Sequence, residues 1–331
     1  MNVRSASAGP AARLADTYSV GGVAIDVSAT GEVAALLDSR LRFLRSPAAK
    51  PASVVFDIRT GDDDGFAVSP AGPGRPVYDA PGGRLMYFDG PDQLFIEYPG
   101  YFRMLCSPGT GLVQSAVLRE GAGSVLAAYL FFTIPLIEVM KRNGRFPIHA
   151  GCVAREGRGL LLAGMSGSGK STLTAALVMD GWDFLGDDMV FVARQAGAAL
   201  AWGLSDEIDC SDQTAGMFPK LRHLVGEPTL AGRGKHPVDV EEAFGVRPVP
   251  SCRPHALVLP AISGGRRSVL TAVSASHALR ELAPNVLLTQ SAATQAHLDA
   301  LAELVREVPC YSLATGTDLA FASRCLQEIL G

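Results

Sequence analysis

The stretch 163–177, AGMSGSGKSTLTAAL, lies near the middle of the chain and has the spacing Gly164, four residues, then Gly169-Lys170-Ser171. This is the phosphate-loop pattern, in which glycines let backbone N–H groups approach a polyphosphate without interference from Cβ atoms. A helix that starts near Lys170 adds an N-terminal dipole that favours an anion. The lysine can reach the β- and γ-phosphates, and the Ser171 hydroxyl can bind Mg²⁺.

The residues on either side of the loop support this interpretation. Residues 159–164 (GLLLAG) form a short apolar run that is typical of a buried strand, and residues 171–179 (STLTAALVM) have the apolar spacing of a helix. A flexible glycine linker would lack both flanking elements. We therefore predict that the loop binds a nucleotide through Gly164, Met165, Ser166, Gly167, Ser168, Gly169, Lys170, Ser171 and Thr172.

The composition limits the class of protein. The chain has 331 residues, of which 48% are hydrophobic and 19% are charged, so it is globular and can bury a sizeable core. The formal net charge is −4 and no basic run occurs, which argues against nucleic acid as the main partner. Six cysteines are scattered without a C-x-x-C pair, and this pattern favours reduced thiols in a cytoplasmic protein over disulfides or zinc ligands.

No segment has the properties of a targeting or membrane-spanning sequence. The first 20 residues contain no apolar core of a secretory signal. The longest apolar run, residues 124–140, is interrupted by Pro135 and Glu138 and is shorter than the roughly 18 to 20 residues that span a bilayer. We expect a buried helix here, a cytoplasmic location and no membrane partner.

The chain divides by pattern into two predicted domains. Residues 1–144 form a smaller α+β domain with one amphipathic helix over 31–44 and a linking helix over about 122–143, and they contain no recognisable chemical motif. Residues 145–331 form the nucleotide-binding domain, which begins with a strand over 146–154. The short strands of the first domain are expected at 19–27, 52–58, 84–89, 94–100 and 102–107.

Two other classes of nucleotide-binding protein fit the sequence poorly. Residues 262–267 (ISGGRR) look like the signature of an ABC transporter, but such an ATPase needs a hydrophobic strand that ends in Asp-Glu soon afterwards, and residues 285–290 (NVLLTQ) carry no acid. We interpret 263–267 as a β-turn between strands at 255–261 and 267–273. A GTPase would need an N-K-x-D motif to recognise the base, and none is present.

A wider pattern around the loop resembles the catalytic domain of HPr kinase/phosphorylase and its related kinases. That family has a strand with a histidine, a second strand, a GxxGxGKS loop, a helix and a paired Asp-Asp. Here His149 lies fifteen residues before Gly164, and Asp187 and Asp188 lie seventeen and eighteen residues after Lys170. The resemblance is strong over about residues 146–195. It continues weakly through 235–245, 248–259 and 282–316, and the first half of the chain is unlike the family's N-terminal domain.

The resemblance implies an α/β fold with a phosphate-loop domain of the HPr-kinase and PEP-carboxykinase type, and a kinase that uses ATP and Mg²⁺. Phosphoryl transfer needs positive groups that neutralise the negative charge of the γ-phosphate and a group that accepts the proton of the attacking hydroxyl. The family assigns the base role to the position of Asp188 and leaves Asp187 as a supporting or metal-binding residue. A histidine at the position of His149 can hydrogen-bond the base and tune its pKa.

Two further site residues are expected from the resemblance. The family has a downstream glutamate that binds Mg²⁺, and we assign this role to Glu207, although the stretch 203–212 also offers three aspartates and lacks the family's RG-x-G sequence. Arg253 matches an Arg-Pro of the family at a similar distance. The alternatives in the acidic stretch are Asp206, Asp209 and Asp212.

The sequence thus favours a kinase that transfers the γ-phosphate of ATP to a hydroxyl, most simply a serine, of an unidentified protein or peptide. One alternative is a regulatory or assembly module that binds nucleotide with little transfer activity. A second alternative is a PEP-carboxykinase-like enzyme, which would need Mn²⁺ and arginine ligands for a dicarboxylate. A homo-oligomer is one possible assembly.

Overall fold

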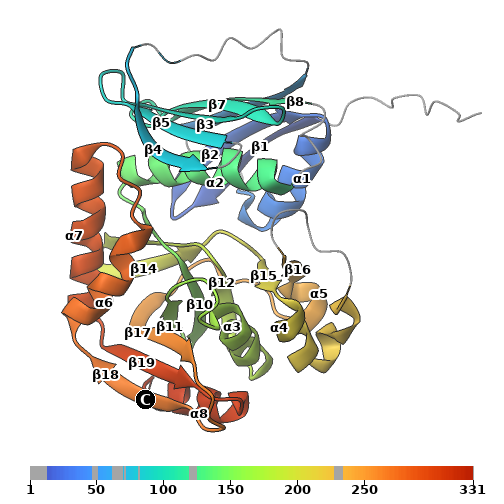
Figure 1. Ribbon diagram of the computed structural model, residues 1–331, viewed down its shortest axis with the longest axis vertical. Coiled ribbons are helices and arrows are strands. Elements are labelled where there is room, and N and C mark those ends of the chain that lie inside the picture. Colours follow the sequence, from blue (N-terminus) through green and yellow to red (C-terminus); the bar gives the residue numbers. More distant parts are fainter. Residues whose placement is uncertain are drawn as a thin grey trace, which may run out of the picture. The chain divides into compact units, whose positions relative to one another are not determined.

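The computed structural model describes residues 13–46, 51–61, 70, 72–80, 83–118, 125–226 and 234–330. Contacts divide the chain into two compact units, of which the first comprises Met1–Ser19 and Val23–Val139 and the second comprises Val20–Gly22 and Met140–Gly331. The division falls inside helix α2 (Val125–Arg142), which the sequence predicted over about 122–143. The fold is mixed α/β with several sheets (Figure 1).

The first unit is built on one eight-stranded sheet with the order β1-β2-β3-β8-β7-β6-β5-β4. Strands β2, β3 and β8 pair in parallel, and the successive pairs from β4 to β8 are antiparallel. The strands are β1 (Arg13–Val20), β2 (Val23–Thr30), β3 (Val54–Gly61), β4 (Arg75–Ala80), β5 (Gly83–Phe88), β6 (Gln93–Tyr98), β7 (Phe102–Ser107) and β8 (Leu112–Leu118).

Two helices, α1 (Glu32–Leu41) and α2, cover one face of this sheet (Figure 1). Buried and half-buried residues alternate along β2, β7 and β8, because successive side chains of a strand point to opposite faces. The ring centres of Phe56 on β3 and Phe132 on α2 lie 4.7 Å apart. The expected strand over 19–27 is wrong, because Gly21 and Gly22 both have positive φ and separate β1 from β2.

The second unit contains three sheets. Six strands have the order β12-β10-β11-β17-β19-β18, three have the order β14-β13-β9, and β15 pairs with β16. The strands are β9 (Phe146–Ile148), β10 (Ala150–Arg155), β11 (Arg158–Ala163), β12 (Asp183–Gly186), β13 (Val190–Gln195), β14 (Ala198–Gly203), β15 (Glu207–Cys210), β16 (His236–Asp239), β17 (Arg253–Ile262), β18 (Val269–Val273) and β19 (Cys310–Thr315).

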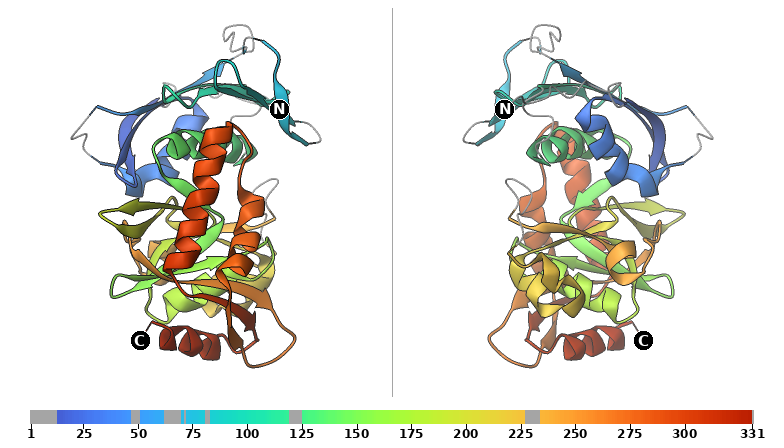
Figure 2. Two further views of the ribbon diagram at one scale, coloured as in Figure 1. Left: turned by 90° about the vertical axis from the view of Figure 1, so that its left-hand side faces the viewer. Right: turned by 90° about the vertical axis from the view of Figure 1, so that its right-hand side faces the viewer.

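The helices of the second unit lie on both faces of the six-stranded sheet. On one face α3 (Lys170–Met179) and α8 (Leu319–Glu328) pack in a core that includes Leu162 of β11. On the other face α6 (Ala275–Leu282) and α7 (Ser291–Glu307) pack in a core that includes Leu161 of the same strand (Figure 2). Two shorter helices, α4 (Asp212–Met217) and α5 (Val240–Phe244), follow β15 and β16.

The strand directions define one edge of this sheet. β11 pairs in parallel with β17, and β17 pairs in parallel with β19. β10 is antiparallel to both β11 and β12, so β12 runs in the same direction as β11. The carboxyl ends of these four strands therefore lie at the same edge, where α/β proteins bind their ligands.

Two segments, one of which was expected to be a single strand, each change sheets in the middle. The expected strand over 146–154 is wrong, because it breaks at His149 into β9 and β10, which belong to different sheets. The segment 182–192 breaks at residues 187–189 into β12 and β13, which pair with β10 and β9 respectively. Because the two breaks lie opposite each other, the local folding of these strands places His149 against the acidic pair.

Residues 263–267 connect β17 and β18, which lie close to the expected strands at 255–261 and 267–273, but these two strands are not neighbours in the sheet. β19 lies between β17 and β18 in the sheet, so the connection crosses over β19. The Ser263 N–H donates to the Thr315 carbonyl at 2.8 Å, and the Thr317 N–H donates to the Gly265 carbonyl at 3.1 Å. This crossing brings the end of β17 beside the end of β19.

The apolar run near residues 124–140 lies in helix α2, and the six cysteines are all in the described part of the chain. Residues 125–142 form one helix with Pro135 inside it. Within the described ranges, no helix is long and apolar enough to cross a membrane. All six cysteines are free thiols, and the Sγ atoms of Cys152 and Cys252 lie 3.6 Å apart in the core.

Candidate functional site

The phosphate loop connects β11 to α3. Gly164, Gly167 and Gly169 have φ values of 153°, 81° and 96°, which a residue with a Cβ atom adopts only with strain. Gly169 is the left-handed N-cap of α3, so the helix begins directly at Lys170. The backbone conformation of the loop therefore explains why glycine stands at these three positions. The first turn of α3 faces the loop.

Lys170 is turned towards its own loop. Its ammonium group donates to the carbonyls of Gly164 at 2.7 Å and Met165 at 3.0 Å, and the side chain is buried. Burial lowers the pKa of Lys170, and the negative charges of Asp188 and Asp187 oppose that effect. The lysine thus lies between the loop and the acidic pair.

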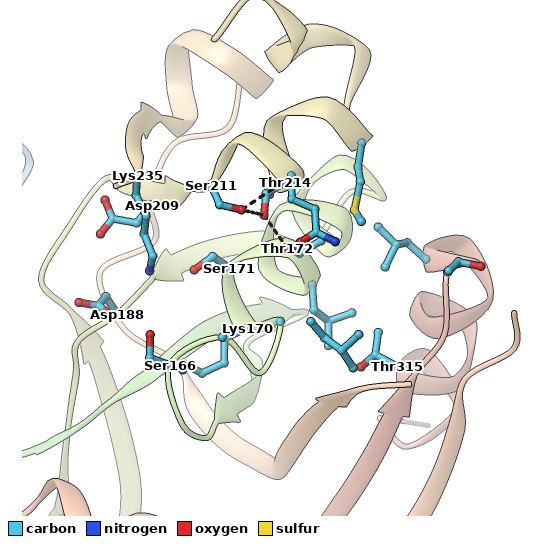
Figure 3. Close-up of a pocket in the computed structure, with 18 of the residues that line it drawn as sticks. Ser166, Lys170, Ser171, Thr172, Asp188, Asp209, Ser211, Thr214, Lys235 and Thr315 are labelled. Atoms are coloured by element: carbon cyan, nitrogen blue, oxygen red, sulfur yellow. Dashed lines mark hydrogen bonds between the residues drawn. The ribbon is translucent and has the colours of Figure 1, made fainter. Parts of the chain in front are cut away.

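A pocket of about 300 Å³ opens in front of the loop, at the edge where the four strands end (Figure 3). Most of the predicted loop residues line it, whereas Gly164, Met165 and Ser168 do not. The lining residues outside the loop include His149, Leu173, Asp188, Asp209, Ser211, Gln213, Thr214, Met217, Lys235, Ile262, Ser263, Thr315, Gly316, Thr317 and Leu319.

Asp188 has a backbone conformation that is costly for an aspartate. Its φ is 95°, and the Met189 N–H donates to the Asp187 carbonyl at 2.8 Å. A hydrogen bond over two residues with positive φ at the centre forms a strained γ-turn. Such strain is concentrated at functional sites, where the surrounding structure holds it in place.

His149 contacts Asp188 from the facing break. The His149 Nδ1–H donates to the Asp188 carbonyl at 2.9 Å, and Nδ1 lies 3.3 Å from the Asp188 carboxylate. Burial lowers the pKa of His149, and the charge of Asp188 opposes this. The structure therefore brings together two residues that are 39 positions apart in the sequence, and their catalytic roles stay predictions.

Asp187 is buried below the pocket. Neither of its carboxylate oxygens meets the geometry of a hydrogen bond with another described residue. Burial raises the pKa of Asp187 to about 7. The Ser171 hydroxyl is near enough to lower that pKa, and the charge of Asp188 adds to the increase. A Cβ atom on Gly151 would lie 2.4 Å from the Thr174 hydroxyl oxygen and 3.1 Å from Asp187 Oδ1, so glycine makes room for both groups.

The structure does not bring two predicted residues to the pocket. Arg253 is exposed and begins β17, opposite Arg158, whereas the pocket lies at the other end of that strand near Ile262. The length of the strand therefore separates Arg253 from the loop, and its catalytic role stays a prediction. Glu207 begins β15 and does not line the pocket, whereas Asp209 on the same strand does.

Several lining residues were missed by the sequence analysis. A cluster of hydroxyls joins α3 to α4, with the Thr172 and Thr214 oxygens 2.7 Å apart and Ser211 Oγ 3.1 Å from that of Thr214 (Figure 3). Lys235 comes from the start of β16, and residues 315–317 follow β19. The signal for Lys235 was weak, since it begins the stretch 235–245 that has only a faint family resemblance.

Comparison with known proteins gives two findings. A family model described as SynChlorMet cassette protein ScmC matches residues 124–203. That range contains His149, the loop and the acidic pair, and it ends before Asp209 and Lys235. No curated protein matches this chain.

Among solved structures, the chain is similar to one described as the structure of the Hpr(Ser) kinase/phosphatase from Coxiella burnetii. The sequence identity is 14%, and the match covers 55% of this chain and 88% of that chain with a TM-score of 0.30.

Proposed function

We propose that this chain is an ATP-dependent kinase that transfers the γ-phosphate to a hydroxyl, most simply a serine, of a protein or peptide. One observation carries the proposal. The phosphate loop and the His149–Asp188 contact, which come from separate parts of the sequence, lie at one pocket. A nucleotide held by the loop would have its terminal phosphate near a carboxylate. An HPr-kinase-type fold of the second unit belongs to the same proposal and rests on these residues.

The chemistry of the pocket suits a nucleoside triphosphate. Lys170, Lys235 and the first turn of α3 supply positive charge for phosphates. Apolar side chains that a base could contact also line the pocket, and Ile262 and Met217 are 66% and 46% exposed. A site for a free phosphate alone would not need this apolar part. The apolar lining residues are Leu173, Met217, Ile262 and Leu319.

The residues fit a Mg²⁺ ion that is bound together with the nucleotide. Mg²⁺ is usually held by one or two carboxylates and by substrate phosphates, and not by a cage of protein ligands. Asp187 is a buried carboxylate without a hydrogen-bond partner in the described structure, and the Ser171 hydroxyl lies towards it. No group of three or more His, Cys, Asp or Glu side chains in the described residues could hold a metal ion by itself. Bound Mg²⁺ would supply positive charge to the β- and γ-phosphates.

In the proposed transfer step, Asp188 accepts the proton of the acceptor. The hydroxyl oxygen of the acceptor forms a bond to the γ-phosphorus, the bond from this phosphorus to the β–γ bridging oxygen breaks, and ADP leaves with that oxygen. The hydroxyl proton passes to the Asp188 carboxylate. His149 holds the backbone of Asp188 through its Nδ1–H, which fixes the direction of the carboxylate.

The other functions considered have less support. A module that only binds nucleotide would gain nothing from the strained conformation of Asp188, so this strain favours transfer. A PEP-carboxykinase-like enzyme would need arginines for a dicarboxylate, and none of the described residues that line the pocket is an arginine.

The first test concerns nucleotide binding. Lys170→Ala removes the cation of the loop, and we expect it to abolish most of the affinity for Mg·ATP in a calorimetric titration. Lys220→Ala is the matched control, because Lys220 is exposed and outside the pocket, and it should bind as the unchanged protein does. Equal affinities of all three proteins would reject the proposed function.

A second arm of the test concerns transfer. Asp188→Asn should keep the affinity for Mg·ATP and lower transfer by about 10²–10⁴, which is the usual contribution of a general base. The measurement is mass analysis of candidate protein and peptide acceptors after incubation with ATP and Mg²⁺. Unchanged transfer by Asp188→Asn would show that the base role is misassigned.

A further inference from the structure

The pocket contains a second lysine that the phosphate-loop motif does not explain. Lys235 lies directly before β16 and lines the pocket together with Lys170, Asp188 and Asp209. Figure 3 shows Lys235 beside Asp209, on the side of the pocket where Asp188 lies and away from Thr315. Lys235 is therefore at the end of the pocket where the transfer step would take place.

The neighbouring residues fix the place of Lys235. His236 pairs with Cys210 in the β15–β16 ladder, and it is only 4% exposed. Its Nε2 atom lies 2.7 Å from Asp212 Oδ1. Burial of His236 thus fixes the backbone next to Lys235, whose side chain lines the pocket.

The charge of Lys235 is available for a ligand. Within the described residues, its ammonium group forms no hydrogen bond or ion pair. Its charge nevertheless reaches the site, because it lowers the pKa values of Lys170, His149 and Asp187. Two lysines that repel each other across a pocket are stabilised by an anion between them.

We propose that Lys235 contacts the γ-phosphoryl group of ATP from the side opposite Lys170 and stabilises the charge on this group during transfer. Lys170 comes from the loop and reaches the β- and γ-phosphates, whereas Lys235 shares the side of the pocket with Asp188. Positive charge at that position acts on the oxygens of the group that moves from ADP to the acceptor. This inference rests on the proposed kinase function and adds a catalytic residue to it.

The experiment compares Lys235→Met with Lys235→Arg and with Lys220→Met, in which an exposed lysine outside the pocket is changed. Calorimetry gives the affinities for Mg·ADP and for the Mg²⁺ complex of a non-hydrolysable ATP analogue. We expect Lys235→Met to weaken the analogue about tenfold and ADP by less than about threefold, because only the analogue carries a γ-phosphate. Lys235→Arg should keep most of the preference for the analogue, and Lys220→Met should change neither affinity.

Single-turnover transfer gives the second measurement. Removal of one preorganised donor to a transition-state charge costs about 10²–10³ in rate, so Lys235→Met should lose that much while Lys235→Arg recovers part of it. Equal loss of affinity for both nucleotides, or full transfer activity of Lys235→Met, would overturn the inference.

Two controls separate the possible causes. If Lys235 only neutralises Asp209, then Asp209→Asn should restore the binding and transfer of Lys235→Met, and this outcome would also overturn the inference. If Lys235→Met has an altered circular dichroism spectrum, the Lys235→Arg and Asp209→Asn results decide the question. The proposed function fails separately, when the unchanged protein does not bind nucleotide or when Lys170→Ala binds normally.

Discussion

At the scale of single residues, the backbone conformation at position 188 favours glycine, whereas the proposed reaction needs a carboxylate there. A glycine would adopt a φ of 95° without strain, yet the chain has an aspartate there. The energetic cost of such a residue is of order 1–3 kcal/mol. The stability of the second unit is therefore lower than the same fold could have.

This strain predicts that substitutions of Asp188 change stability and activity separately. Asp188→Gly should be about 1 kcal/mol more stable than Asp188→Ala, because both lack the carboxylate and only glycine relieves the strain. Both variants should transfer phosphate equally poorly. Urea unfolding of the two variants measures the free energy difference. If the alanine variant is as stable as the glycine variant, the strain at residue 188 is absent.

His297 predicts a dependence of stability on pH that is separate from the pocket. It is 1% exposed on α7, and its Nε2–H donates to the Pro147 carbonyl at 2.8 Å. Burial lowers the pKa of His297 to about 4, so the folded state keeps the ring neutral where the unfolded state takes up a proton. Stability should therefore fall by about 2–3 kcal/mol as the pH decreases from 7 towards 4.

The measurement is urea unfolding at pH 7.5 and at pH 5 for the unchanged protein and for His297→Gln, which cannot be protonated. The glutamine variant should lose less stability between the two pH values. The same loss in both proteins would assign the pH dependence to other groups.

At the scale of secondary-structure elements, the sequence predicted those whose signals are local. The strand β11, the loop and α3 follow from contiguous residues, because glycine spacing and apolar periodicity act over a few positions. The break at His149 was missed, because residues 146–154 are apolar and extended on both sides of it. Only the pairing with a second sheet, which is non-local, distinguishes two strands from one.

The packing of α3 against β10 predicts a large effect of one methyl group. A Cβ atom on Gly151 would lie 2.4 Å from Thr174 Oγ1, which is far inside contact distance. Gly151→Ala should therefore destabilise the protein by about 1–3 kcal/mol. Adding Thr174→Ala should recover most of this loss, since it removes the oxygen that the new methyl group meets.

Chemical denaturation of the two single variants and the double variant tests this packing. Thr174→Ala alone serves as the control for the loss of the hydroxyl. Additive effects of the two substitutions would show that Gly151 and Thr174 are not in contact.

At the scale of the whole molecule, the described residues that line the pocket all belong to the second unit. They run from His149 to Leu319. The loop, His149 and the acidic pair were predicted from their spacing, and the structure brings them close together, with Asp187 below the pocket. The sequence analysis missed Lys235 and residues 315–317, because strand order, and not distance along the chain, brings them to the loop.

This assignment predicts which parts of the chain nucleotide binding protects from amide hydrogen exchange. With Mg·ATP present, amide hydrogen exchange should slow in the loop, in α3 and around residues 187–189. The eight-stranded sheet of the first unit should exchange at the same rate with and without nucleotide. Mass spectrometry of peptides from both units measures this. Protection of β1 to β8 would show that the first unit takes part in nucleotide binding.

The facing breaks in β9–β10 and β12–β13 also have a consequence for how this protein can vary. His149 lies at one break and Asp188 at the other, and each is held in place by the facing break. A change at one residue should therefore affect the other. A lineage that does not need the proposed transfer would gain stability from glycine at 188, and its His149 would then be free to change. Descendants should therefore retain the pair together or lose it together, and the amino acid at 188 would report which of them keep the residues for the proposed transfer.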